Sequence, residues 1–316
     1  NTNMINNKLK ISIVATIYNS EKIIPVLVER INAVFENLDF NYEIILVNDN
    51  SPDNSWNVIK EICNNQKNVK GILLSRNFGQ QIAMSSGMNY AKGDYVIIMD
   101  GDLQNPPEAI PEIILKLESG FDVVYTRSIT RNNKTDEWTS KLFYFLLLKV
   151  LKVKIVPNQL MLKGFNKKFI TLFNTYHENI RTIIGIVYDI GLKSCVLNVN
   201  NSSRYEGKSS YNFTKRFSLM VDLILSMSNK PIERVIFFSL MVFVISILMS
   251  LWTLINYILY PNLPQGYSTI IISIFVFSSL ILLVLGIIGK YISFILNEVR
   301  NRPLYIVQEI INEDKF

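Results

Sequence analysis

The stretch Tyr95-Val-Ile-Ile-Met-Asp100-Gly-Asp102 decides the fold, because a buried strand ends there in two carboxylates. The residues before Asp100 are apolar without alternation, which is typical of a strand covered on both faces in a parallel sheet. The carboxyl ends of such strands form the edge at which α/β proteins bind ligands. Carboxylate oxygens at that edge suit a divalent ion that holds a diphosphate. The stretch therefore predicts an α/β protein that handles a nucleotide.

Strand and helix patterns alternate on both sides of this stretch. We expect strands over residues 10–17, 42–48, 69–75, 95–99 and 122–126. We expect helices over residues 21–37, 53–65, 79–91 and 107–119. This order predicts a doubly wound, Rossmann-like α/β domain, in which right-handed crossovers bring the carboxyl ends of the strands to one edge.

Polar side chains follow all five predicted strands. They are Tyr18, Asn19, Asp49, Ser51, Arg76, Asn77, Asp100, Asp102 and Arg127. A single one of them could be a helix cap, and Asp53 and Ser51 are candidates for that role. A set from five strand ends indicates one crevice. Neither the dinucleotide fingerprint nor the P-loop occurs, which disfavours NAD chemistry and ATP hydrolysis. A carboxylate pair with a metal fits a reaction in which a nucleoside diphosphate leaves.

A second region has the composition of a membrane segment, since no charged residue occurs from Val235 to Gly289. A turn-forming cluster over residues 261–266 divides it into two stretches of about 26 and about 23 residues, each enough to span a bilayer. Lys and Arg flank the outer ends and are absent from the turn, which places both termini in the cytoplasm. The alternative, a hairpin buried in a soluble protein, needs a larger shell than 316 residues supply. The N-terminal segment is polar, and we expect no cleavable signal there.

The expected organisation has four parts. Residues 1–212 form a cytosolic catalytic domain, 213–233 a juxtamembrane amphipathic helix, 234–296 a transmembrane hairpin with helices at about 235–260 and 267–290, and 297–316 a cytosolic tail. This makes the chain a multi-pass protein of the cytoplasmic (inner) membrane. Residues 138–153 mix aromatic residues with lysines, and they form either a helix in the headgroup layer or a core helix whose lysines reach water.

The charge pattern bears on partners. The net charge is +6, and lysines concentrate over residues 141–168, Lys163 among them. Beside a membrane hairpin such a basic surface suits the lipid bilayer or a lipid phosphate better than nucleic acid. Cys63 and Cys195 have no partner motif and are expected to be reduced core residues. His177 lies in a polar run and is expected to be solvated.

An ordered set of motifs resembles the inverting family 2 glycosyltransferases that act on polyprenyl phosphates. The motifs are Val14-Ala-Thr-Ile-Tyr-Asn19, Val47-Asn-Asp49-Asn-Ser51-Pro-Asp53, Leu74-Ser-Arg76-Asn-Phe-Gly79, Met99-Asp-Gly-Asp-Leu-Gln104-Asn-Pro-Pro-Glu108 and Arg204-Tyr-Glu-Gly-Lys-Ser-Ser-Tyr211. With the hairpin and the C-terminal tail, the resemblance covers nearly the whole chain. It is strongest to the undecaprenyl-phosphate aminoarabinose transferases and the O-antigen polyprenyl-phosphate glucosyltransferases, and it extends to dolichyl-phosphate mannose synthases.

The resemblance implies a GT-A fold and a role for each matching residue. Asp49 would hydrogen-bond the nucleotide base, with Thr16, Tyr18 and Asn19 beside it. Asp100 and Asp102 would bring Mg²⁺ or Mn²⁺ to the diphosphate, with Gln104 next to them. Arg76 would face the donor diphosphate, and the acceptor phosphate would be bound by Arg127, Arg204 and Ser209. The resemblance also implies a homotetramer.

Four positions depart from the family pattern. Thr16 replaces the common Pro, Ser20 an acidic residue, Asn50 a Gly and Asn105 an Asp. Asn50 is a mild change, because Asn tolerates positive φ. Thr16 and Ser20 affect base or ribose contacts, which makes a UDP-sugar donor a weaker inference than the fold. Asn105 removes a negative charge near the metal and leaves both predicted ligands in place.

The resemblance implies inverting sugar transfer to the phosphate of a polyprenyl (undecaprenyl) phosphate, for a cell-envelope glycan or lipid. A phosphate monoester is already an oxyanion near pH 7, so it needs no carboxylate base. The segment Pro157-Asn-Gln-Leu-Met-Leu162, where relatives with hydroxyl acceptors carry that base, has none. Two alternatives stay open: a processive polysaccharide synthase, whose Gln-x-x-Arg-Trp string is missing, and a catalytically inactive membrane scaffold.

Overall fold

The structure is a computed structural model that describes residues 9–129, 159–176, 183–199, 266–300 and 302–313, together with Met241, Leu248, Trp252 and Ile255. The chain divides into two compact units, one of Asn1–Ser210 with Pro303–Phe316 and the other of Tyr211–Arg302. Several predicted features lie outside the described residues. They are Arg204, Ser209, His177, the helix ranges 138–153 and 213–233, and most of the first membrane-helix range.

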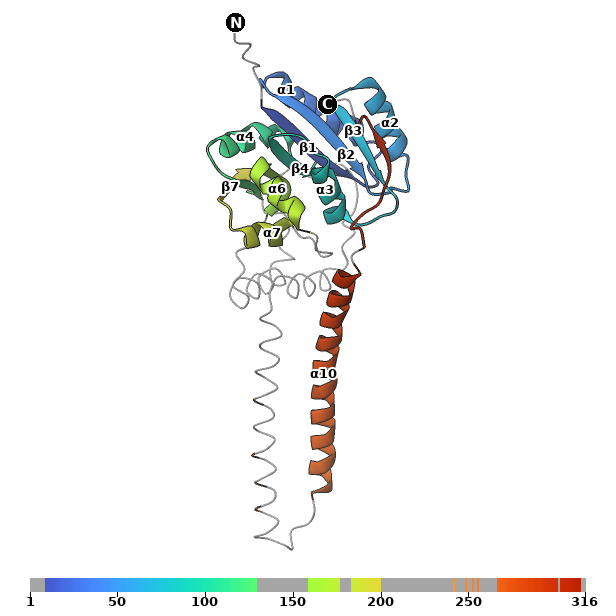
Figure 1. Ribbon diagram of the computed structural model, residues 1–316, viewed down its shortest axis with the longest axis vertical. Helices are drawn as coiled ribbons and strands as arrows, with labels where there is room; N and C mark the ends of the chain where they lie inside the picture. Colours follow the sequence, from blue (N-terminus) through green and yellow to red (C-terminus); the bar gives the residue numbers. More distant parts are fainter. Residues whose placement is uncertain are drawn as a thin grey trace. The chain divides into compact units, whose positions relative to one another are not determined.

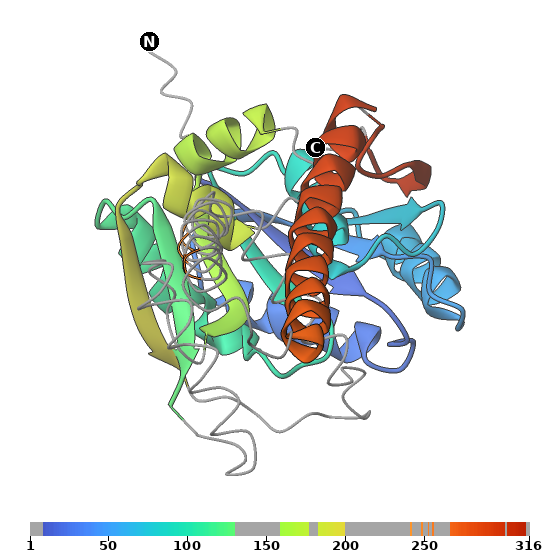
Figure 2. The ribbon, with the colours of Figure 1, turned by 90° about the horizontal axis from the view of Figure 1, so that it is seen from below.

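A mixed eight-stranded sheet forms the centre of the first unit, in the order β7-β5-β6-β4-β1-β2-β3-β8. The strands are β1 (Lys10–Ile17), β2 (Asn41–Asn48), β3 (Val69–Leu74), β4 (Tyr95–Asp100), β5 (Val123–Ser128), β6 (Gln159–Asn166), β7 (Ser194–Val199) and β8 (Val307–Ile311). The first four are parallel, while β6 runs antiparallel between β4 and β5 and β8 runs antiparallel to β3. Figure 2 shows β7 (olive) and β8 (red) at opposite edges.

Helices cover both faces of this sheet (Figure 1). One face packs against α1 (Ile24–Glu36), α2 (Ser55–Asn65) and α4 (Ile110–Glu118), the last preceded by the short 3₁₀ helix η1 (Pro107–Ala109). The other face packs against α3 (Gln80–Asn89), α6 (Lys167–Thr175) and α7 (Ile183–Ile190). The result is a three-layer α/β/α arrangement, so the predicted doubly wound fold is confirmed.

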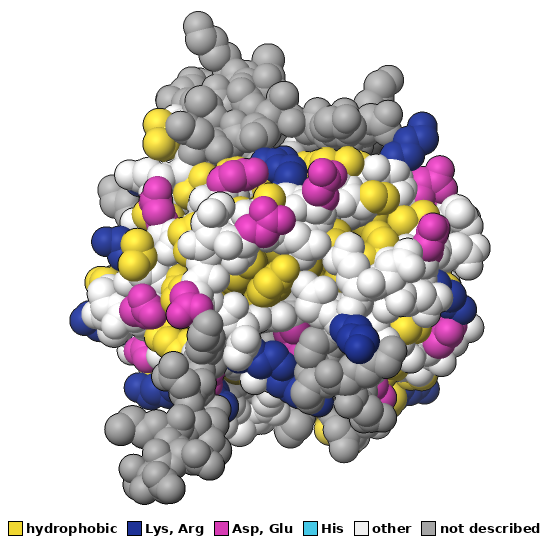
Figure 3. Space-filling model, turned by 90° about the horizontal axis from the view of Figure 1, so that it is seen from above, with side chains coloured by type: hydrophobic (Ala, Val, Ile, Leu, Met, Phe, Trp, Pro, Cys, Tyr) yellow, Lys and Arg dark blue, Asp and Glu magenta, His cyan; other side chains and the backbone are white. Residues whose placement is uncertain are grey.

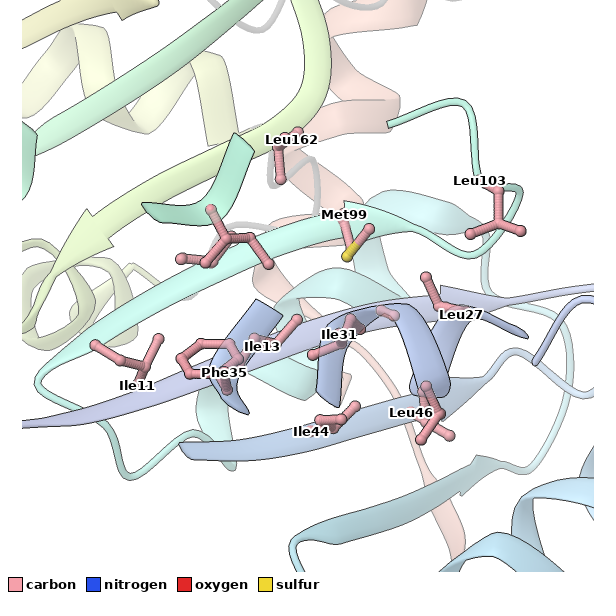
Figure 4. Close-up of a cluster of buried hydrophobic side chains, with 14 of the residues drawn as sticks. Ile11, Ile13, Leu27, Ile31, Phe35, Ile44, Leu46, Met99, Leu103 and Leu162 are labelled. Carbon is pink, nitrogen blue, oxygen red and sulfur yellow. The ribbon is translucent and has the colours of Figure 1, made fainter. Parts of the chain in front are cut away.

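The core explains why the parallel strands read as continuous apolar runs. Successive residues of β1 point to opposite faces, so Ile13 packs with one group of helices and Val14 with the other. Figure 4 shows Leu27, Ile31 and Phe35 of α1 lying over side chains of β1 and β2. With helices on both faces, no position of a central strand is left for water, and alternation disappears.

The predicted elements up to residue 128 are observed, and their ends differ from the predicted ones by at most three residues. The sequence patterns did not predict β6, β7, β8, α6 or α7. Of these, β6 matters most for the site, because it inserts antiparallel beside β4 and carries the motif Met161-Leu-Lys-Gly-Phe165.

The C-terminal tail completes the sheet as β8, next to β3. The Asn312 side-chain amide donates to the Cys63 carbonyl at 2.7 Å and to the Val69 carbonyl at 2.8 Å. Glu309 accepts from the Trp56 indole at 3.1 Å and pairs with Lys60 at 2.8 Å. These contacts cover an edge strand that would otherwise expose unpaired backbone groups.

Most of the described residues of the second unit belong to α10 (Tyr267–Val299). Counting only what the structure describes of the chain, no helix is long and apolar enough to cross a membrane.

In the first unit both cysteines are free thiols, with Cys63 buried and Cys195 half-buried.

One face of the molecule is shown in Figure 3, where acidic and basic side chains of the described residues are interspersed. Nucleic-acid-binding domains gather Lys and Arg into a patch or stripe. The described residues of this face form no such stripe.

Candidate active site

The two aspartates of the Asp100-Gly-Asp102 run lie at the carboxyl end of β4, next to β1. Asp100 is paired in register with Thr16, and the Gly101 amide donates to the Thr16 carbonyl at 3.1 Å. A Cβ on Gly101 would lie 2.6 Å from Ile17 Cδ1 and 2.7 Å from the Thr16 carbonyl oxygen. The turn is therefore pressed against β1, and the space admits only glycine between the two aspartates.

Asp102 is held by the turn itself. Its Oδ1 accepts the backbone N–H of Gln104 at 3.0 Å, and Leu103 between them has a positive φ of 58°. Aspartate commonly closes such a turn through its own side chain. Asp102 and Gln104 are thus linked within this turn.

Asp100 is half-buried and surrounded by donors. The Gln80 amide at the start of α3 donates to Oδ1, and the Asn105 amide donates to Oδ2 at 3.5 Å. Burial, with the like charge of Asp102 as the second cause, raises the pKa of Asp100 to about 7. The two carboxylates repel each other, and a divalent cation bound between them would neutralise their charge.

Asn105 departs from the family pattern with a clear physical consequence. Its side chain is 2% exposed and donates toward Asp100. An aspartate at this position would place a third carboxylate there and repel the other two.

Lys163 on β6 approaches the same carboxylate and interacts with it electrostatically. The residue is 2% exposed, and burial lowers the pKa of its ammonium to about 8, while Asp100 opposes that shift. The prediction that Lys163 belongs to a basic surface is therefore wrong. Residues 161, 163 and 165 of β6 share the face that packs on α3 and α6, which carries Lys163 into the interior.

Asp49, the predicted base-binding residue, follows β2 and is 4% exposed. Its two oxygens accept the backbone N–H groups of Phe78 at 2.7 Å and Gly79 at 2.9 Å. Burial raises the pKa of Asp49, although these two hydrogen bonds act against it. Gly79 is the N-cap of α3, so Asp49 supplies a negative charge at the helix N-terminus. Each oxygen keeps a lone pair that a base N–H could use.

The loops after β1 and β2 are joined by hydrogen bonds at this edge. The backbone N–H of Asn19 donates to Ser51 Oγ at 2.8 Å, and the backbone N–H of Glu21 donates to Asp53 Oδ2 at 3.2 Å. Asp53 Oδ1 also accepts the backbone N–H of Ser55, the first residue of α2, at 3.2 Å, but the N-cap of α2 is Asn54, so the predicted capping role of Asp53 is not confirmed. Asn19 and Asn50 adopt positive φ of 51° and 48°. The side chain of Tyr18 is 47% exposed beside this network.

The arginines are distributed along the same edge. Arg76 is exposed and stacks on Phe78, with its guanidinium carbon 4.1 Å from the ring centre. Arg127 lies on β5, which β6 separates from β4, so two strand spacings put it roughly 10 Å from Asp100. Its guanidinium donates to Asn198 Oδ1 at 2.9 and 3.1 Å. All the predicted residues that the structure describes thus lie along the carboxyl edge of the sheet. Thr16, Asp102 and Gln104 lie on β1 or in the turn after β4, Asp49 and Arg127 lie two strands from Asp100 on opposite sides, and Arg76 lies three strands away.

The residues present fit a divalent cation that shares its ligands with a substrate. Among the described residues no group of three or more His, Cys, Asp or Glu side chains forms a closed metal site. Mg²⁺ bound beside phosphates commonly uses one or two carboxylates and completes its shell with phosphate oxygens and water. Asp100 and Asp102 supply that donor set.

Sequence reasoning missed Gln80 and Lys163 as neighbours of Asp100. Gln80 directly follows the motif that ends at Gly79, so its position after a strand was available as a signal. Lys163 had no such signal, because its placement depends on β6 pairing with β4.

Comparison with known proteins agrees with this geometry. The model of the family described as glycosyl transferase family 2 matches residues 12–181. An undecaprenyl-phosphate 4-deoxy-4-formamido-L-arabinose transferase of Proteus mirabilis is 32% identical over 313 residues, covering 97% of this chain and 95% of that protein. The uncharacterized glycosyltransferase YkcC of Bacillus subtilis is 32% identical over 303 residues, covering 95% of this chain and 94% of that protein.

A solved structure supports the fold. Glucosyl-3-phosphoglycerate synthase from Mycobacterium tuberculosis, crystallised with Mn²⁺, uridine diphosphate and glucosyl-3-phosphoglycerate, matches with a TM-score of 0.50 and 16% identity, over 69% of this chain and 78% of that chain. The likeness shows a shared GT-A-like α/β architecture. With a family model that spans more than half of the sequence and relatives that span nearly all of it, the chain belongs to glycosyltransferase family 2.

Proposed function

We propose that this glycosyltransferase moves a sugar from a nucleotide sugar, of the UDP class, to the phosphate of a polyprenyl phosphate such as undecaprenyl phosphate. The observation that carries the proposal is the Asp100 and Asp102 pair at the carboxyl edge of the sheet. It is supported by similarity over 97% of the chain to a transferase whose name specifies undecaprenyl phosphate. The product would be a polyprenyl-phosphate-linked sugar for the cell envelope.

The donor would lie along the edge formed by β1, β2 and β4. Asp49 would accept from the base, with Thr16, Tyr18 and Asn19 beside the nucleoside. Arg76 would contact the diphosphate, since a guanidinium makes paired hydrogen bonds to phosphate oxygens. Asp100 and Asp102, with Gln104 adjacent, would hold Mg²⁺ or Mn²⁺. Such an ion neutralises charge on a leaving diphosphate when it is bound.

The acceptor's own chemistry explains how the reaction proceeds without a protein base. A phosphate monoester has its second pKa near 6, so it is an oxyanion at about pH 7. Its oxygen would attack the anomeric carbon as the nucleoside diphosphate leaves from the opposite side, which inverts the configuration. Arg127, Arg204 and Ser209 would bind the acceptor phosphate. The described part of the segment that carries a base in hydroxyl-acceptor relatives, residues 159–162, contains no carboxylate.

We also propose that residues 234–296 form a membrane hairpin that keeps the catalytic domain and both termini in the cytoplasm. The sequence supports this, because 55 consecutive positions from Val235 to Gly289 lack charge and Lys230, Arg234 and Lys290 flank them. A homotetramer is the assembly we propose on resemblance.

The experiment compares two acceptors that differ only in the phosphate. The purified full chain in detergent receives Mn²⁺, a panel of labelled nucleotide sugars and either undecaprenyl phosphate or undecaprenol. We expect label in the lipid fraction with the phosphate and none with the alcohol. Transfer to undecaprenol, or none to either lipid with any donor, would contradict the proposal.

A further inference from the structure

Residues 76–80, which comprise the end of the loop after β3 and the first residue of α3 and are called the 76–80 loop, join the two ends of the predicted donor site. At one end Asp49 accepts the N–H groups of Phe78 and Gly79 at 2.7 and 2.9 Å. At the other end the Gln80 amide donates to Asp100 Oδ1. Asp49 follows β2 and Asp100 ends β4, and β1 separates these two strands. The 76–80 loop therefore connects two carboxylates that the sheet itself keeps apart.

The loop has a fixed backbone at the point where Gln80 emerges. Gly79 has φ of 92°, a region that favours glycine, and its carbonyl accepts the amides of Ile82 at 3.1 Å and Ala83 at 3.0 Å. Gly79 is thus held from both sides, by Asp49 through its N–H and by the first turn of α3 through its carbonyl. This fixes where the side chain of Gln80 starts.

Packing does not account for the presence of Gln80. The residue is exposed, whereas the buried face of α3 begins at Ala83. Its described side-chain hydrogen bond goes to Asp100. An exposed glutamine with a hydrogen bond to a half-buried carboxylate acts on that carboxylate rather than on the core.

We propose that Gln80 is a positioning residue for the divalent metal: its amide fixes the rotation of the Asp100 carboxylate before the ion binds. The inference rests on the proposed function, because it assumes that Asp100 is a ligand. Carboxylates that bind metals are commonly oriented by hydrogen bonds from neighbouring side chains, and removing such a partner typically lowers metal affinity 10- to 100-fold. Asn105 donates to the other oxygen at 3.5 Å, so each oxygen of Asp100 has one side-chain amide donor.

The test measures Mn²⁺ binding to the full chain in detergent, without any substrate, from the electron paramagnetic resonance signal of free Mn²⁺. Gln80→Met keeps the length of the side chain and removes the donor. Gln81→Met is the matched control, since Gln81 is the next residue of the same helix and no side-chain hydrogen bond of it to a described residue is found. We expect the Mn²⁺ dissociation constant to rise about 10- to 100-fold in Gln80→Met and less than twofold in Gln81→Met. Wild-type affinity in Gln80→Met, or equal weakening in both variants, would overturn the proposal.

A second pair of variants tests the loop as the support of Gln80. An alanine Cβ at Gly79 would meet nothing within 4 Å, so Gly79→Ala changes the backbone preference alone. Gly120→Ala introduces the same strain at φ of 90°, also without a clash, after α4. We expect weaker Mn²⁺ binding in Gly79→Ala only. Equal affinity in these two variants would overturn the role of the loop.

The same preparations separate this inference from the proposed function. If the wild type binds Mn²⁺ and transfers sugar while Gln80→Met binds Mn²⁺ equally well, the positioning role falls and the function stands. If the wild type binds Mn²⁺ but transfers no sugar with any donor, the proposed function falls, and the Mn²⁺ affinities still decide the positioning role.

Discussion

Replacing Asp100 with Asn should remove one pH dependence of the protein's stability. Burial and the neighbouring Asp102 raise the pKa of Asp100 to about 7 in the folded protein, against an ordinary value of 3.8. Between these two values the folded protein keeps a proton that the unfolded chain has lost. Unfolding then releases a proton, so the free energy of unfolding falls as the pH rises from about 4 to about 7.

The size of the effect follows from the shift. One pKa unit corresponds to about 1.4 kcal/mol, so three units set an upper limit of about 4 kcal/mol. Asp100 is partly exposed, and solvent screening reduces this to about 2 kcal/mol. Lys163 does not contribute to the slope, because its pKa of about 8 keeps it protonated in both states across this range. Asn cannot titrate, so the Asp100→Asn variant should lose this part of the slope.

Thermal unfolding in EDTA at pH 4.5 and pH 7 measures the difference. In a domain of 150–250 residues, about 2 kcal/mol corresponds to roughly 4–8 °C. We expect the melting temperature of Asp100→Asn, relative to that of wild type, to rise by roughly 4–8 °C between pH 4.5 and pH 7. Asp53→Asn is the control: burial raises the pKa of Asp53, but hydrogen bonds from Ser51 and Ser55 outweigh it and lower the pKa, so Asp53 titrates below this range. Parallel curves for wild type and Asp100→Asn would refute the reasoning.

Three further substitutions test the surroundings of the site. Asp49→Asn should lower the free energy of unfolding in urea by about 1–3 kcal/mol, because the asparagine side chain cannot accept both N–H groups of the 76–80 loop. It should also weaken UDP binding measured by calorimetry, and no change in either quantity would contradict the loop contact. Gly101→Ala should lower the free energy of unfolding by about 1–3 kcal/mol and abolish sugar transfer, because its Cβ would lie 2.7 Å from the Thr16 carbonyl oxygen. Full activity would show that the turn has room for a side chain. Asn312→Ala should lower the free energy of unfolding by about 1–3 kcal/mol and increase amide hydrogen exchange in β3, because the Cys63 and Val69 carbonyls lose their donor. Unchanged exchange would show that Asn312 does not anchor β8.

The parallel part of the fold could be predicted from sequence because its signals are local. Strands buried on both faces read as unbroken apolar runs, and the polar residue after each run marks the carboxyl edge. For this reason the apolar runs alone place Asp49 and Asp100 at the carboxyl edge, where the structure has them.

Pairings between distant segments carry no comparable signal. β8 pairs with β3 across more than 230 residues, and nothing in the sequence of Val307–Ile311 indicates which strand it pairs with. Lys163 belongs to a lysine-rich region, and only the insertion of β6 between β4 and β5 turns it inward. Gln80 could be placed near the edge, but its contact with Asp100 depends on the direction in which α3 starts.

The most direct test of the central claim compares sugar transfer by wild type and Asp102→Asn. Each enzyme receives Mn²⁺, undecaprenyl phosphate and the nucleotide sugar that the wild type uses to label the lipid. The product is identified and quantified by mass spectrometry. If Asp100 and Asp102 hold the metal against the donor diphosphate, Asp102→Asn should form at most about one hundredth of the sugar-linked lipid phosphate. Transfer at the wild-type rate by Asp102→Asn, or by wild type with excess EDTA, would contradict the account.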